Sequence, residues 1–139
     1  MKEKLKSRLQ RMYVTGAALL LLMLSMGSTV FACEYYYDAN EGIGIEVHAP
    51  KDVMVTKSSA GTIEGDKVTV SGGSLWATWK DGVLFRANYD HSTKTHRCSA
   101  TNDHFTTIRS QWMPAGSTAR TDWLEQTVSN NKVWAATMD

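Results

Sequence analysis

The sequence lacks an apolar run that could span a bilayer. No charge appears from residue 12 to residue 26, but the apolar core of that stretch covers only residues 17–24, whereas a spanning helix needs about 20 residues. Five of the first eleven residues are Lys or Arg, and Gly27 and Ser28 end the apolar run. A cationic start, a short apolar core and a small residue before the cleaved bond, here Ala32, are typical of a secretory signal peptide. We therefore expect residues 1–32 to be removed, and the mature protein to be secreted without a transmembrane segment.

The part after the signal lacks an excess of positive charge. Five of the 15 Lys and Arg residues but only one of the 14 Asp and Glu residues lie in residues 1–32, which leaves ten against 13, a formal net charge of −3. Nucleic acids and anionic membrane surfaces are bound through clustered positive charge. We therefore expect no nucleic-acid partner, and the length suits one domain. The sequence leaves open whether the protein forms a homodimer.

Spacings typical of catalytic and metal sites are also absent. Zinc-ligand types gather in one short segment, but none has the paired short spacing of a zinc site. These residues are Asp90, His91, His96, Cys98 and His104. A hydrolase would need Cys98 or a serine as nucleophile, with Asp103 or Asp122 orienting a histidine, but no nucleophile elbow or cysteine-protease signature is present. We expect no enzyme activity, no metal and no cofactor.

The only two cysteines, Cys33 and Cys98, both follow the signal. An oxidising compartment allows a disulfide between them, and closing such a long loop would stabilise the fold by roughly 4 kcal/mol on the chain-entropy model. The sequence Val30-Phe31-Ala32-Cys33 also resembles a bacterial lipobox, whose cysteine is lipidated and anchors the protein to the cell surface. We expect free secretion and the Cys33–Cys98 disulfide, with a lipid-anchored Cys33 as the alternative, since one sulfur cannot do both.

Apolar residues alternate with a period of two along the mature chain, which predicts β-strands. The expected strands cover residues 43–48, 53–56, 67–71, 75–79, 83–89, 105–112, 119–124 and 132–138. Asp81-Gly82 between two apolar runs predicts a hairpin with a type I′ turn, in which both residues have positive φ. Short strands at this spacing indicate an all-β fold, a small antiparallel β-sandwich or barrel. Residues 120–128 are the one segment with a helical alternative.

Tryptophan divides the mature chain near Gly72-Gly73. Residues 33–71 contain no tryptophan, whereas residues 72–139 contain all five, so we expect the packed β-sandwich domain at 72–139. The leader at 33–71 adds strands to that domain, forms a hairpin of its own, or is removed on maturation. Trp76 and Trp79 are three apart, so in one strand they face opposite sides; one belongs in the core, and the other is exposed or covered by the leader.

Four segments of residues 72–139 carry a family resemblance. They are Gly72-Gly73-Ser74-Leu75-Trp76, residues 87–96, Ala115-Gly116 and Asn131-Lys132-Val133-Trp134-Ala135. The most specific is the pattern Asn-Tyr-x-His-Ser-x-Lys-Thr-His at residues 88–96. Together they resemble the lactococcin 972 family of bacteriocins. The resemblance implies a β-sandwich of two three-stranded sheets, secreted by a Gram-positive bacterium, that binds the cell-wall precursor lipid II and blocks septum formation without a pore.

The same motif supplies the candidate ligand-binding residues. They are Asn88, Tyr89, His91, Lys94, His96, Trp76 and Arg97. In one strand the two histidines would face opposite ways, so only a turn between them brings both to one site. An exposed tryptophan beside Lys94, Arg97 or Arg109 would suit an anionic, partly apolar ligand such as lipid II. The alternative function is a non-toxic secreted or lipid-anchored module for surface binding or adhesion.

Overall fold

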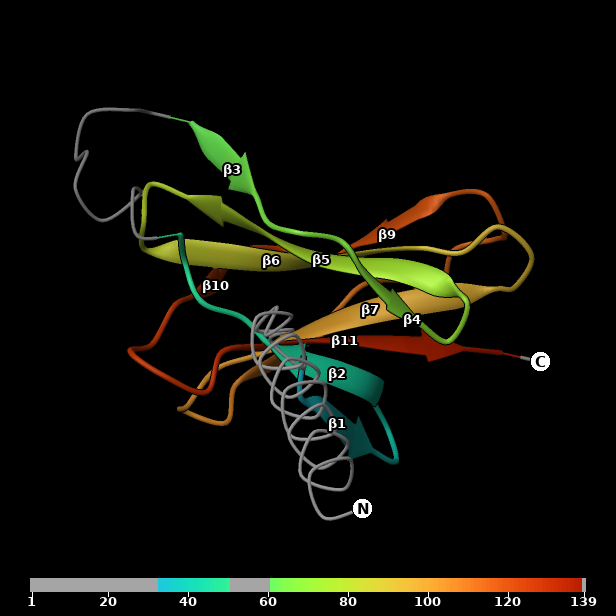
Figure 1. Cartoon of the computed structure of the whole chain (residues 1–139), viewed down its shortest axis with the longest axis horizontal. Coiled ribbons are helices and arrows are strands. Elements are labelled where there is room, and N and C mark those ends of the chain that lie inside the picture. Colours follow the sequence, from blue (N-terminus) through green and yellow to red (C-terminus); the bar gives the residue numbers. More distant parts are fainter. Residues whose placement is uncertain (1–32, 51–60, 139) are drawn as a thin grey trace, which may run out of the picture. The chain divides into compact units, whose positions relative to one another are not determined.

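The computed structural model describes residues 33–50 and 61–138. The signal peptide and the expected strand at 53–56 lie outside these residues. Within the described part every regular element is a strand, and the strands form two antiparallel sheets that lie one over the other (Figure 1). None of the described residues belongs to a helix that could cross a membrane. The predicted all-β fold of two sheets is therefore confirmed, but the sheets have five and six strands, not the three each that the family resemblance implies.

The first sheet has five strands in the order β1-β2-β11-β7-β8. Their bounds are β1 Tyr35–Asp38, β2 Gly42–Glu46, β11 Lys132–Thr137, β7 His96–Thr101 and β8 Thr107–Arg109. The strand nearest the C-terminus, β11, lies between β2 and β7, with Trp134 opposite Gly44 on one side and Ser99 on the other. The first sheet is thus completed only by pairing segments far apart in the sequence.

The second sheet is built around the long hairpin of β5 and β6, and its main order is β10-β6-β5-β3. In addition, β4 pairs with β5 and β9 pairs with β6. The bounds are β3 Thr62–Glu64, β4 Val68–Val70, β5 Gly73–Lys80, β6 Leu84–Asp90, β9 Thr118–Arg120 and β10 Leu124–Glu125.

The hydrophobic core lies between the sheets, because each strand turns alternate residues inward. In β5 these include Leu75 and Trp79, and in β7 they include Cys98 and Ala100, all at most 4% exposed. Trp79 lies in the core, whereas Trp76 is on the opposite face of β5, where the ammonium of Lys67, from the leader, is 4.0 Å from its ring centroid. The prediction for the two tryptophans is confirmed.

Strands from residues 33–71 belong to both sheets. β1 and β2 join the first sheet through β11, and β3 and β4 join the second through β5. Contacts accordingly group Cys33–Asp139 as one compact unit. In this structure the leader supplies extra strands to the same unit, so the first sheet includes residues from both sides of position 72.

Two tight turns have the geometry that their sequences favour. Asp81 and Gly82 have φ of 54° and 69°, and the N–H of Val83 donates to the carbonyl of Lys80. The predicted type I′ turn is therefore confirmed. Ser71 and Gly72 repeat this pair of positive φ angles, 49° and 84°, between β4 and β5.

The helical alternative at 120–128 is wrong. Leu124 and Glu125 pair with Phe85 and Leu84 as β10, because the buried Leu124 side chain completes the core at the start of β6. Three strands, β1, β3 and β7, lie outside every expected range, and of these β7 is in the interior of the first sheet.

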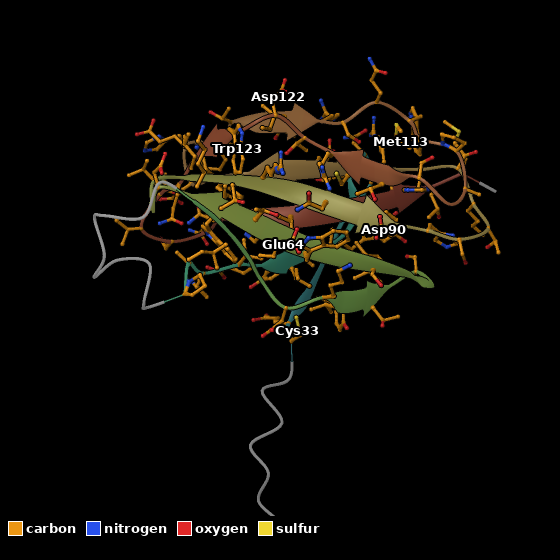
Figure 2. All side chains as sticks on the ribbon, turned by 90° about the horizontal axis from the view of Figure 1, so that it is seen from above. Cys33, Glu64, Asp90, Met113, Asp122 and Trp123 are labelled. Carbon is orange, nitrogen blue, oxygen red and sulfur yellow. The ribbon has the colours of Figure 1, made fainter. Side chains whose placement is uncertain are left out.

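The two cysteines are not bonded. Cys33 is exposed just before β1, at the edge of the first sheet (Figure 2), and Cys98 lies three strands away in β7. Neighbouring strands are about 4.8 Å apart, so roughly 14 Å separates two chains that a disulfide needs within about 7 Å. The Cys98 thiol instead donates to the carbonyl of Ala87, at 3.3 Å, across the core. The predicted Cys33–Cys98 disulfide is absent because Cys98 points between the sheets.

Candidate binding site

The family-like motif at residues 88–96 forms the crossover between the two sheets. Asn88 and Tyr89 end β6, residues 92–94 bend, and His96 begins β7. The bend brings the His91 and His96 ring centroids to 6.2 Å, and both rings pack against Tyr89, at 6.1 and 5.4 Å. A bend of this kind is the condition that sequence analysis set for both histidines to reach one site.

The His91 ring stabilises this bend. Its Nδ1 accepts from the backbone N–H groups of Thr93 and Lys94, at 3.2 and 3.0 Å, and its Nε2 lies 3.0 Å from the carbonyl oxygen of Ser71. Two donors at Nδ1 and an acceptor at Nε2 fit the neutral tautomer protonated on Nε2. His91 therefore ties the bend to the turn between β4 and β5.

His96 is fully buried, and carbonyl oxygens face both of its ring nitrogens. Nδ1 is 2.9 Å from the carbonyl of Lys94, and Nε2 is 2.8 Å from that of Ser117. Each ring nitrogen thus lies within hydrogen-bond distance of a backbone carbonyl, and a ring N–H donates to the oxygen it faces. The backbone of His96 also exchanges two hydrogen bonds with Met113. This histidine clamps the crossover to the loop around residue 117.

Asn88 and Tyr89 are also buried, each with partners inside the fold. The Asn88 amide donates to Thr78 Oγ1 at 2.9 Å and accepts from Arg120 Nε at 3.1 Å. The Tyr89 hydroxyl donates to the carbonyl of Val70 at 2.8 Å, and burial raises its pKa to about 12.

Five of the seven candidate ligand-binding residues thus have little surface to offer a ligand. They are Asn88, Tyr89, His91, His96 and Trp76, each at most 5% exposed. Their side chains fix the path of the chain from one sheet to the other. Of the seven candidates, only Lys94 and Arg97 are partly exposed and could contact a ligand directly.

An exposed tryptophan does lie beside one of these cations. Trp112 is 37% exposed, and the Arg97 guanidinium carbon is 4.9 Å from its ring centroid. Arg97 Nη2 donates to the carbonyl of Asn40, at 2.7 Å, which holds the guanidinium in place. We call Arg97, Arg109 and Trp112 the arginine–tryptophan surface; Lys94 lies in the crossover that leads into β7.

A buried carboxylate orients the arginines of this surface. Glu41, in the turn between β1 and β2, is 5% exposed and accepts two hydrogen bonds from Arg109, one of them from Nε at 2.7 Å. It also accepts from Ser99 Oγ at 2.5 Å and lies 4.0 Å from Arg97 Nη2. Its hydrogen bonds raise the pKa of Arg109. Sequence analysis missed Glu41, because a single acidic residue between strands gives no sign of burial.

The turn between β1 and β2, which contains Glu41, has a recognisable sequence pattern. The Asp38 carboxylate accepts from the N–H groups of Asn40 and Glu41, at 2.8 and 3.0 Å, and these bonds lower its pKa. Gly42 has φ of 86°, and a Cβ there would lie 2.2 Å from the carbonyl oxygen of Ala135. An aspartate followed by a glycine four residues later marks this turn.

The outer face of the second sheet, which Figure 2 views from above, carries a second cation–aromatic pair. Arg86 lies 4.4 Å and Lys80 lies 5.8 Å from the Trp123 ring centroid. Burial and the nearby Arg120 lower the pKa of Arg86. The structure describes at least five such contacts, whereas about one is expected per 70–80 residues. Cation–aromatic pairing is therefore a marked property of both outer faces.

Metal-ligating side chains do not converge in the described part of the chain. No group of three His, Cys, Asp or Glu residues there is placed to hold a metal ion. Burial raises the pKa of the Cys98 thiol to about 12, so Cys98 is a protonated core residue at neutral pH. A protonated, water-excluded thiol is a poor nucleophile. The comparisons with known proteins found no protein-family model, no curated protein and no solved structure that matches this chain.

Proposed function

We propose that this chain is a secreted, bacteriocin-like binding protein and not an enzyme. Its target would be lipid II of related Gram-positive bacteria, and binding would inhibit septum and cell-wall synthesis. The observation that carries the proposal is the exposed Trp112 ring beside Arg97. Arg97 directly follows the family-like motif at residues 88–96. A guanidinium pairs with phosphate oxygens, and an adjacent aromatic ring contacts sugar or lipid.

The structure around this surface supports a preorganised site. Glu41 and the Asn40 carbonyl hold the two arginines in fixed positions, so little side-chain entropy is lost when a ligand binds. The two histidines bond to the backbone of Lys94 and so fix the bend in which it lies. The two histidines of the motif would then act by positioning, and Lys94 and Arg97 by contact.

The test is binding of the protein expressed from the full chain to vesicles that contain lipid II, with lipid II-free vesicles as the reference. We expect Lys94→Ala and Trp112→Ala each to weaken binding about tenfold or more, as loss of a binding hot spot does. Trp123→Ala, on the other sheet, is the matched control and should change binding by less than twofold. Growth inhibition of related Gram-positive strains should follow the same order. Equal binding by wild type and Trp112→Ala would refute the assignment to this surface.

A second candidate is the non-toxic surface module anchored through Cys33. One observation favours it: Cys33 is exposed and unbonded, so its sulfur is available for lipidation. The intact mass of the exported protein separates the two. A diacylglycerol increment on a chain that begins at Cys33 would support the anchor, and an unmodified mass would support free secretion.

A further inference from the structure

A pocket on the outer face of the first sheet lies apart from the arginine–tryptophan surface. It has a volume of about 390 Å³, and Thr101, Asp103, Phe105, Asn130, Lys132 and Trp134 are among its lining residues. Thr101, Lys132 and Trp134 are on the outward side of β7 and β11, since their neighbours Ala100 and Val133 belong to the core. The volume falls within the range of small-molecule sites in proteins.

Phe105 projects from the loop between β7 and β8 in an unusual state. Its side chain is 94% exposed, and its φ is 56°, a left-handed conformation that a bulky residue rarely adopts. Asn102 holds this conformation: its Oδ1 accepts from the N–H groups of His104 and Thr106, and its carbonyl accepts from the N–H of Phe105. An exposed aromatic ring at a strained, well-supported position points to a use outside the fold.

The polar groups of the pocket are fixed by bonds to one another. Asn130 Nδ2 donates to Asp103 Oδ1 at 2.7 Å, and Trp134 Nε1 donates to Thr101 Oγ1 at 2.9 Å. These bonds leave the second Asp103 oxygen to serve a ligand hydroxyl. The Lys132 ammonium lies 4.6 Å from the Tyr36 ring centroid, and its three N–H donors allow a ligand hydroxyl as a second partner. One cation and one carboxylate balance in charge, which favours a neutral ligand over an anion.

We infer that this pocket binds a neutral saccharide. A sugar ring has an apolar face that suits the exposed Phe105 ring and a rim of hydroxyl groups that suits Asp103 and Lys132. The inference does not depend on the proposed function, because none of the lining residues belongs to the arginine–tryptophan surface.

The test titrates the protein expressed from the full chain with cellotetraose and with chitotetraose, followed by calorimetry and by the NMR signal of the Trp134 indole N–H. We expect at least one of the two to bind, to shift that signal, and to bind about tenfold or more weakly to Phe105→Gly. Val83→Ala, an exposed apolar residue in the hairpin of the second sheet, is the matched control and should bind as wild type does.

Phe105→Gly also separates a binding role from a structural one. Glycine accepts positive φ without strain, so this variant should be at least as stable as wild type while binding is lost. No binding of either saccharide, undiminished binding by Phe105→Gly, or competition by sodium pyrophosphate would each overturn the inference. Lipid II binding by Phe105→Gly reports separately on the proposed function.

Discussion

Alkaline pH should destabilise this fold through two buried acids, Cys98 and Tyr89. Burial raises the pKa of the Cys98 thiol from 9.0 to about 12, and that of the Tyr89 hydroxyl from 10.0 to about 12. The folded protein therefore keeps protons that the unfolded chain releases, and the free energy of unfolding falls as pH rises from 9 towards 12. Relative to neutral pH, the two groups together should remove about 2 kcal/mol at pH 10 and about 4 kcal/mol at pH 11.

Urea unfolding followed by tryptophan fluorescence at pH 7, 8, 9, 10 and 11 measures this loss. Cys33→Ser serves as the parent, because it leaves Cys98 as the only thiol. Adding Cys98→Ala should reduce the loss between pH 8 and pH 11 by roughly 2.5 kcal/mol, the share of that thiol. Comparing the two proteins cancels the titration of all other groups. Parallel pH profiles would refute the reasoning, because they would mean that water reaches Cys98.

Three further predictions follow from the cysteines and from the turn between β1 and β2. Iodoacetamide at pH 8 should label Cys33 in the native protein and Cys98 only in denaturant, since the buried thiol is protonated. If mass spectrometry finds no free thiol, the two cysteines are bonded to each other and this prediction is wrong. Glu41→Gln should lower the free energy of unfolding by about 2–3 kcal/mol, because it leaves guanidinium groups without their carboxylate, while the exposed Glu125→Gln should have little effect in the same urea titration. Hydrogen bonds to the backbone lower the pKa of Asp38, so its contribution holds above pH 3.8 and is lost in more acid solution; thermal melts of Asp38→Asn should show a shallower acid-side decline than wild type, and identical profiles would contradict this.

Hydrophobic alternation predicts most strands but not the interior strand β7. The inward residues of β7 are His96, Cys98 and Ala100, and between them lie Arg97 and Ser99. This strand does alternate, yet none of its buried side chains is large and apolar, so a pattern based on Val, Ile, Leu and aromatics passes over it. The inward side chains of β7 are buried by tertiary packing against the second sheet. The hairpin turn at Asp81-Gly82, in contrast, depends on local backbone preference and is correctly predicted.

The candidate site was predictable in position more than in chemistry. The polar run at 88–96 does mark the crossover, and it does bring His91 and His96 together. The burial of the two histidines could not be predicted from the sequence. The groups that pair with them, such as the Ser71 and Ser117 carbonyls, come from distant parts of the chain. The same reason hides Glu41, whose partner Arg109 lies far along the chain.

The order in which the strands are made constrains when folding can finish. β11 comes after every other described strand, yet it fills an interior place between β2 and β7. Until the six residues of β11 leave the ribosome or a translocation pore, β2 and β7 each present a bare hydrogen-bonding edge. A nascent chain can close the β5–β6 hairpin early, but the first sheet assembles only once β11 has been made. Closure of the first sheet thus waits for β11, whatever the order in which the other strands pair.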